Sequence, residues 1–107
     1  MKKESKNIQY KQRNILVWNE VAPYYHKRWA REEVGPFNVT NKVIKLSKIK
    51  NGDCVLDLAC GTGLVTKKIV RKVGKNGMVY AIDASKTAIN IAKKWVGIKK
   101  NIRFIIG

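Results

Sequence analysis

The chain is poor in the residues that build metal sites and disulfide frameworks. Its 107 residues include two cysteines, one histidine and seven acidic residues. Cys54 and Cys60 lie six positions apart, which is wrong for a CxxC redox pair, and a zinc site would need more partners than the sequence offers. We therefore predict no metal site and expect two free thiols in a reducing compartment.

Long hydrophobic runs are also missing. The longest apolar stretches, near residues 15–18 and 104–106, fall far short of the roughly 20 residues that a membrane-spanning helix requires. The charged start at residues 1–6 is not followed by the apolar core of a signal peptide. We expect a cytoplasmic protein without a membrane span, and the length predicts one compact unit.

Acidic residues are outnumbered by 23 lysines and arginines, which gives a net charge of +16. The excess is divided equally between the two halves of the chain, so no basic arm is indicated. The densest group, Lys67, Lys68, Arg71 and Lys72, falls on one helical stripe without interleaved aromatic residues. A solvated helix face explains this stripe better than a nucleic-acid footprint does.

The first half of the chain predicts helices. Apolar positions between residues 7 and 33 recur at helical spacing, and Pro23 should divide this segment into two helical pieces because its ring removes a backbone donor. Another helix is expected over residues 37–49, ended by the turn residues 51–53. Its apolar side should consist of Val39, Val43, Ile44 and Leu46.

From residue 54 onward, short apolar strands alternate with helices. Strands are predicted over 54–58, 78–83 and 102–106, and helices over 62–73 and from the Ser85 cap to about 96. The last helix should bury Ala88, Ile89, Ala92 and Val96. This alternation favours a parallel sheet wrapped on two sides. The predicted fold is α/β, a Rossmann-like parallel sheet with flanking helices. The sheet is truncated at three strands and open on the first-strand side, and an N-terminal helical segment precedes it.

Two strand ends carry the chemistry of the chain. The first strand runs into the sequence DLACGTG at 57–63, where an acid precedes a loop of small residues that opens a helix, and the second strand ends at Asp83. The carboxyl ends of neighbouring parallel strands form a crevice for a nucleoside ligand. A dinucleotide site would have a third glycine after Gly61 and Gly63, and Asp57 would repel a pyrophosphate.

The DLACGTG segment resembles the first motif of class I methyltransferases that use S-adenosylmethionine, and Asp83 matches the acid of their second motif. Ala59 stands where that family often has glycine. The resemblance implies that the loop backbone approaches the methionine end of the cofactor and that Asp83 accepts hydrogen bonds from both ribose hydroxyls. The implied cofactor-binding residues are Asp57, Ala59, Cys60, Gly61, Thr62, Gly63, Asp83, Ala84 and Tyr25.

An upstream segment, WNEVAPYY at 18–25, is similar to the aromatic-x-x-Val-Ala-x-x-Tyr pattern of the ubiquinone and menaquinone biosynthesis methyltransferases. Tyr25 takes the place of the tyrosine, whereas His26 stands where that group often has aspartate. In that group the segment folds over the cofactor, so the resemblance implies that Tyr25 lines the pocket. Simple core packing of Tyr24 and Tyr25 is an equal alternative.

The resemblance implies an enzyme that transfers a methyl group from S-adenosylmethionine to a small-molecule or lipid-like acceptor. Residues 1–50 would form a helical cap segment and residues 51–107 the first half of the cofactor-binding domain. Two alternatives stay open: a fragment of an RNA methyltransferase, suggested by the charge, and a non-catalytic module that forms homo-oligomers through its open sheet edge. The sequence assigns no catalytic residue, although Tyr24, Tyr25 and His26 are the nearest candidates for a base.

Overall fold

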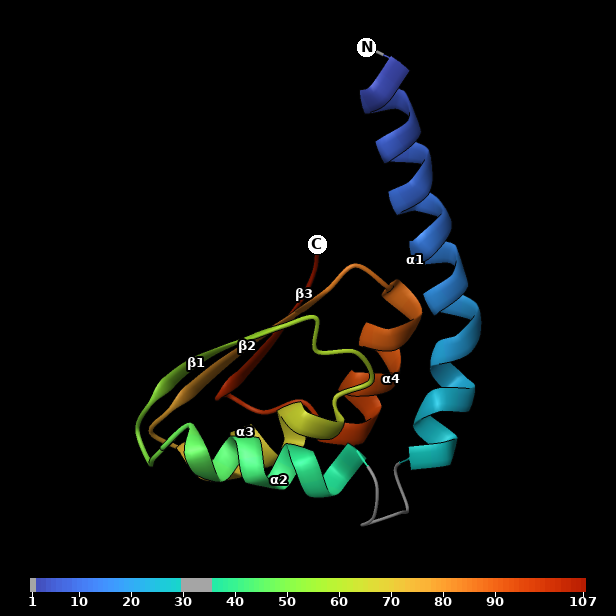
Figure 1. The fold of residues 1–107 in the computed structure, drawn as a ribbon. Helices are drawn as coiled ribbons and strands as arrows, with labels where there is room; N and C mark the ends of the chain where they lie inside the picture. The colour runs from blue at the N-terminus through green and yellow to red at the C-terminus, as the bar shows by residue number, and fades with distance from the viewer. Residues whose placement is uncertain (1, 30–35) are drawn as a thin grey trace.

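The computed structural model of the chain describes the backbone of residues 2–29 and 36–107 and the side chains of residues 7–28 and 41–107. The elements, in order, are α1 (Lys2–Trp29), α2 (Pro36–Leu46), β1 (Cys54–Leu58), α3 (Leu64–Val73), β2 (Met78–Asp83), α4 (Lys86–Val96) and β3 (Ile102–Ile106) (Figure 1). The three strands lie where the sequence predicted them, and Ser85 caps α4 by accepting a hydrogen bond from the N–H of Ala88.

The strands form one parallel sheet in the order β1, β2, β3. Leu58 of β1 lies opposite Ile82 of β2, and Asp83 lies opposite Ile106 of β3. This register brings the three carboxyl ends to the same edge of the sheet. Among the described residues β1 pairs only with β2.

The two faces of the sheet differ in burial. Val79 and Ala81 are fully buried on the face that packs against α3 and α4, whereas Leu56 and Leu58 on the opposite face are 57% and 67% exposed. The described helices thus cover one face and not the predicted two. The sheet grows in one direction from β1 to β3, and right-handed crossovers then place both connecting helices on the same side.

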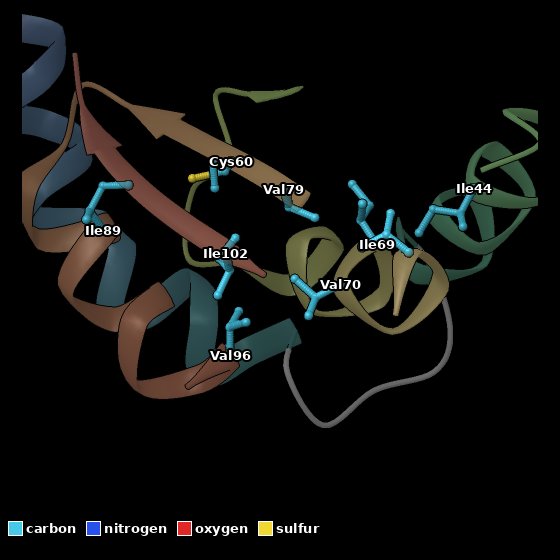
Figure 2. Close-up of a cluster of buried hydrophobic side chains, with 10 residues drawn as sticks. Ile44, Cys60, Ile69, Val70, Val79, Ile89, Val96 and Ile102 are labelled. Atoms are coloured by element: carbon cyan, nitrogen blue, oxygen red, sulfur yellow. The ribbon is translucent and has the colours of Figure 1, made fainter. Parts of the chain in front are cut away.

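The core lies between this covered face, α3 and α4. Figure 2 shows its aliphatic side chains converging from the strands and helices, with Ile44 joining from α2. The buried cluster consists of Ile44, Cys60, Ile69, Val70, Val73, Val79, Ala81, Ile89, Val96 and Ile102. The stripe predicted for α4 is confirmed, because Ala88, Ile89, Ala92 and Val96 are its buried residues.

The prediction that Pro23 divides the first helical segment is wrong. Pro23 lies inside α1, which is one continuous helix of 28 residues. Asn19 before the proline and His26 after it both bond to other elements, and these contacts keep the two turns in line despite the missing backbone donor. The last residues of the predicted segment, 30–33, lie outside the described residues.

The prediction for α2 is wrong in two respects. The helix ends at Leu46, because Lys48 adopts a left-handed conformation with φ 57°. Of the predicted apolar side, Ile44 is buried in the core, while Val43 and Leu46 are exposed. Val43 lies about 100° and Leu46 about 160° around the helix axis from Ile44, so these three residues cannot share one narrow stripe. The side chain of Val39 is outside the described part.

Both cysteines are free, with Cys54 exposed and Cys60 buried. Within the described ranges, no group of three His, Cys, Asp or Glu side chains could hold a metal ion. In the same ranges, no helix has both the length and the apolar character needed to cross a bilayer.

Candidate functional site

A cavity of about 530 Å³ opens at the carboxyl ends of β1 and β2. Its lining residues are Trp18, Ala22, Tyr25, Leu58–Thr62, Leu64, Val65, Ile82–Ser85, Ala88 and Gly107. Helix α1 therefore forms one wall, and the loop after β1 and the turn after β2 form the others. Small-molecule sites commonly enclose about 300 to 1,000 Å³ and are mainly apolar, so this cavity has the size and character of one.

The structure brings most of the predicted site residues to this cavity. Seven of them line it: Ala59, Cys60, Gly61, Thr62, Asp83, Ala84 and Tyr25. Asp57 and Gly63 are not among the lining residues. Of the two adjacent tyrosines, Tyr25 lines the cavity, whereas Tyr24 does not and is 75% exposed. The role of these residues in binding a cofactor stays a prediction.

The Asp83 carboxylate joins the two strand ends. Its Oδ2 accepts a hydrogen bond from the N–H of Gly61 at 2.9 Å, and its Oδ1 accepts one from the N–H of Ser85 at 2.9 Å. A carboxylate offers about four lone-pair positions, so two remain for a ligand. Asp83 thus orders the glycine loop and still has acceptor capacity at the cavity wall.

The glycine loop leads into a helix start that carries no capping side chain. Gly63 is the N-cap of α3, with φ 86°, and the first turn of α3 holds no acidic residue. The first amides of a helix have no partner within the helix and favour a negative group. Leu64 and Val65 of this turn line the cavity. The start of α3 therefore suits a carboxylate on the ligand.

Two backbone positions explain the small residues of the loop. A Cβ at Gly63 would lie 3.0 Å from the Cβ of Ala92, so glycine lets the loop pack closely on α4. Ala59 has φ 56°, a left-handed conformation that is uncommon outside glycine. This strain explains why a glycine is well suited to position 59.

Behind the loop, Asp57 lies half-buried on the covered face and accepts a hydrogen bond from the Thr66 hydroxyl at 2.7 Å. Burial raises the pKa of the Asp57 carboxyl, the bond from Thr66 opposes this, and the charge of Asp83 raises it further. Burial, together with the charges of both acids, raises the pKa of the Cys60 thiol to about 12. Cys60 is therefore a neutral thiol near pH 7 and not a nucleophile.

Asn19 and His26 anchor α1 beside the cavity. Sequence reasoning gave no role to Asn19 and considered His26 only as a candidate base, so it missed this anchoring role. The side-chain oxygen of Asn19 accepts hydrogen bonds from the Ser85 hydroxyl and, at 3.4 Å, from the N–H of Thr87. Nδ1 of His26 lies 2.9 Å from the Thr62 hydroxyl, and burial lowers the pKa of His26. Their spacing of seven residues places them on one helix face, which is the only sequence signal for this pair.

The raised pKa of Asp57 gives a pH-dependent stability. The folded state favours the protonated carboxyl more than the unfolded state does. The resulting contribution to stability is full below the unfolded-state pKa and is lost as pH rises through the folded-state pKa. Asp57→Asn keeps an acceptor for Thr66 without the charge. We expect the free energy of unfolding of the variant, relative to the original chain, to increase from pH 4 to pH 7 in urea titrations followed by circular dichroism.

The matched control for this prediction is Asp53→Asn, because the Asp53 carboxylate accepts its bond from the N–H of Lys50 in an exposed turn. This control reports the effect of exchanging a carboxylate for an amide at an exposed position. A pH-independent loss of stability in Asp57→Asn would contradict the prediction.

Comparisons with known proteins agree with this geometry. Residues 55–107 match the family model described as a methyltransferase domain. The probable cobalt-precorrin-6B C(15)-methyltransferase (decarboxylating) of Saccharolobus solfataricus is 38% identical over 99 residues, which are 86% of this chain and 50% of that protein. The ubiquinone/menaquinone biosynthesis C-methyltransferase of Hydrogenovibrio crunogenus is 32% identical over 97 residues, 87% of this chain and 34% of that protein.

Among solved structures, an S-adenosylmethionine-dependent methyltransferase from Aquifex aeolicus matches with a TM-score of 0.55 and 32% identity, covering 64% of this chain and 37% of that chain. The chain spans half or less of the length of these curated relatives. The family match contains both predicted motifs. The chain belongs to the class I S-adenosylmethionine-dependent methyltransferases and resembles their ubiquinone and menaquinone biosynthesis group.

Proposed function

We propose that this chain supplies the cofactor-binding portion of a methyltransferase that acts on a small-molecule or lipid-like acceptor. The observation that carries the proposal is the Asp83 carboxylate, which stands beside the glycine loop on the wall of a mainly apolar cavity. The names of the two curated relatives, which refer to a cobalt-precorrin and to quinones, support an acceptor of this class. Residues 1–50 would act as the helical cap segment and residues 51–107 as the first half of the domain.

The donor set of the site fits S-adenosylmethionine. This ligand carries a ribose, a carboxylate, an ammonium and a sulfonium, but no phosphate. Asp83 would hold the ribose hydroxyls, and the start of α3 would favour the carboxylate. Asp57 and Asp83 place negative charge at the carboxyl ends of β1 and β2, although the net charge of the chain is +16. This local negative charge suits the ammonium and the sulfonium of the ligand.

When bound, the cofactor supplies a methyl group on a sulfonium, which is open to in-line displacement by the acceptor. The part of the protein is to align the reactants and exclude water. Apolar lining residues such as Trp18, Leu64 and Val65 serve the second task. Two of the three candidate bases lack the required setting, because His26 is bonded to Thr62 and Tyr24 does not line the cavity, whereas Tyr25 lines it.

Isothermal titration calorimetry with S-adenosylhomocysteine tests this proposal. The chain should bind the ligand, and Asp83→Ala should weaken binding about 10- to 100-fold, because charge-assisted hydrogen bonds to the ribose are lost. Asp53→Ala is the control, since Asp53 precedes β1 at the opposite end of the strand. Absence of binding, or equal affinity in Asp83→Ala, would refute the proposal.

A second candidate acceptor is RNA, and a basic groove between α2 and α3 supports it. The groove has a volume of about 620 Å³ and is lined by Asn41, Ile44, Lys45, Lys68, Arg71 and Lys72. Four cationic side chains around one concavity suit the phosphates of a nucleic-acid backbone. Among the described side chains, no aromatic one lines the groove to stack on bases, so contact with the nucleic-acid backbone would not depend on the base sequence.

Fluorescence anisotropy with single-stranded RNA tests the RNA candidate. The logarithm of the binding constant should fall with the logarithm of the salt concentration by about 0.7 for each phosphate contacted. Arg71→Glu with Lys72→Glu should reduce this slope, whereas the control pair Lys99→Glu and Lys100→Glu, which lies outside the groove, should reduce it less. Failure to bind at low salt would remove this candidate.

Self-association is the third candidate. It is supported by the open edge of β1 and by the exposed Leu56 and Leu58 beside it. Sedimentation equilibrium should then show a mass of twice the chain mass or more, and Leu56→Lys should shift the protein toward the monomer. A monomer at all concentrations would exclude a homo-oligomer through this edge.

A further inference from the structure

Helix α1 docks on the rest of the protein through a narrow stripe. Of its described side chains, only Ala22 is buried, and Ile15, Asn19 and His26 are half-buried. These four residues recur at intervals of four, three and four, which is one face of a helix. The larger apolar residues Leu16, Trp18 and Tyr24 are mostly exposed. The stripe therefore buries few apolar side chains. Its specific contacts are the hydrogen bonds of Asn19 and His26 and the edge-to-face contact of the His26 ring with Trp95, whose ring centroids lie 4.9 Å apart.

The two polar residues of this stripe bond to the two segments that form the proposed cofactor site. Asn19 accepts from the Ser85 hydroxyl, and the N–H of Ser85 donates to the Asp83 carboxylate at 2.9 Å. His26 bonds to the hydroxyl of Thr62 in the glycine loop at 2.9 Å. Asn19 thus connects the stripe to the turn after β2, and His26 connects it to the loop after β1.

The cavity wall depends on these two contacts. Trp18 adjoins Asn19 and Tyr25 adjoins His26 in the chain, and both aromatic residues line the cavity together with Ala22. Their rings meet edge to face, with centroids 6.4 Å apart. Because the aromatic residues lie next to the anchored positions, a displacement of α1 would remove this wall.

The geometry points to Asn19 and His26 as positioning residues that hold α1 against the cofactor segments and so complete the cavity. Neither residue lines the cavity. Their effect on ligand affinity rests on the proposed function, whereas their effect on the docking of α1 does not. Ser85 is 1% exposed, and its hydroxyl donates to Asn19 while accepting from the N–H of Ala88. Loss of Asn19 would leave this buried donor without its acceptor.

Amide hydrogen exchange on the free protein tests the docking. Asn19→Ala and His26→Ala should each speed the exchange of amides in residues 15–26 and leave the amides of β1, β2 and β3 protected. Alanine has a higher helix propensity than asparagine, so faster exchange cannot come from a weaker isolated helix. Asn19→Asp retains an acceptor for Ser85 and should restore slow exchange. Unchanged exchange in Asn19→Ala, or no rescue by Asn19→Asp, would overturn the inference.

Calorimetry with S-adenosylhomocysteine tests the consequence for binding. Asn19→Ala should weaken binding about 5- to 30-fold, Asn19→Asp should stay within about 3-fold of the original chain, and so should the control Glu20→Ala on the exposed side of α1. Equal affinity of Asn19→Ala and the original chain would overturn the inference. If the original chain does not bind, the proposed function fails, and the exchange experiment still decides whether these residues position α1.

Discussion

The Asp83 carboxylate bridges the loop after β1 and the turn after β2, and the rest of the site depends on this bridge. Its two oxygens accept the N–H groups of Gly61 and Ser85, residues 24 positions apart that parallel pairing brings to the same edge of the sheet. Backbone donors at such a crevice need acceptors, and a carboxylate satisfies two while keeping capacity for a ligand. The same residue therefore shapes the cavity and is its best candidate for contact with a ribose.

A second layer of polar contacts extends from this bridge to the helices. Ser85 connects the bridge to Asn19 of α1, Thr62 connects the glycine loop to His26, and Thr66 connects α3 to Asp57. Hydrogen bonds thus connect the cavity wall contributed by α1 to the segments after β1 and β2, whereas the apolar core joins α3 and α4 to the sheet. A change at the α1 contacts can therefore alter the site without unfolding the sheet.

The strands and the buried stripe of α4 were predictable from the sequence, because the local hydrophobic pattern and the tertiary packing agree in these elements. Short apolar runs bounded by turn residues define β1, β2 and β3, and Ser85 has both the side chain and the position of an N-cap. The glycine loop and Asp83 followed from the same pattern, since parallel strands place their carboxyl ends together, whereas Tyr25 was implied by the resemblance to the methyltransferases. Their arrangement around one cavity was therefore expected, even though Asp57 and Gly63 stand outside its lining.

The remaining features depend on contacts between distant parts of the chain. Pro23 predicts a break on local grounds, but bonds on either side of it keep α1 continuous. The contact between Asn19 and Ser85 spans 66 positions, and no periodicity indicates which residue would meet Asn19. The exposure of Leu56 likewise reflects which face the helices cover, which follows from the direction of sheet growth and not from the strand itself.

The most direct test of the central claim is a crystal structure of the chain with S-adenosylhomocysteine. The account predicts both ribose hydroxyls within hydrogen-bond distance of the Asp83 carboxylate, the ligand carboxylate at the start of α3, and Trp18 and Tyr25 against the ligand. A ligand bound elsewhere, or an Asp83 side chain turned away from it, would contradict the account.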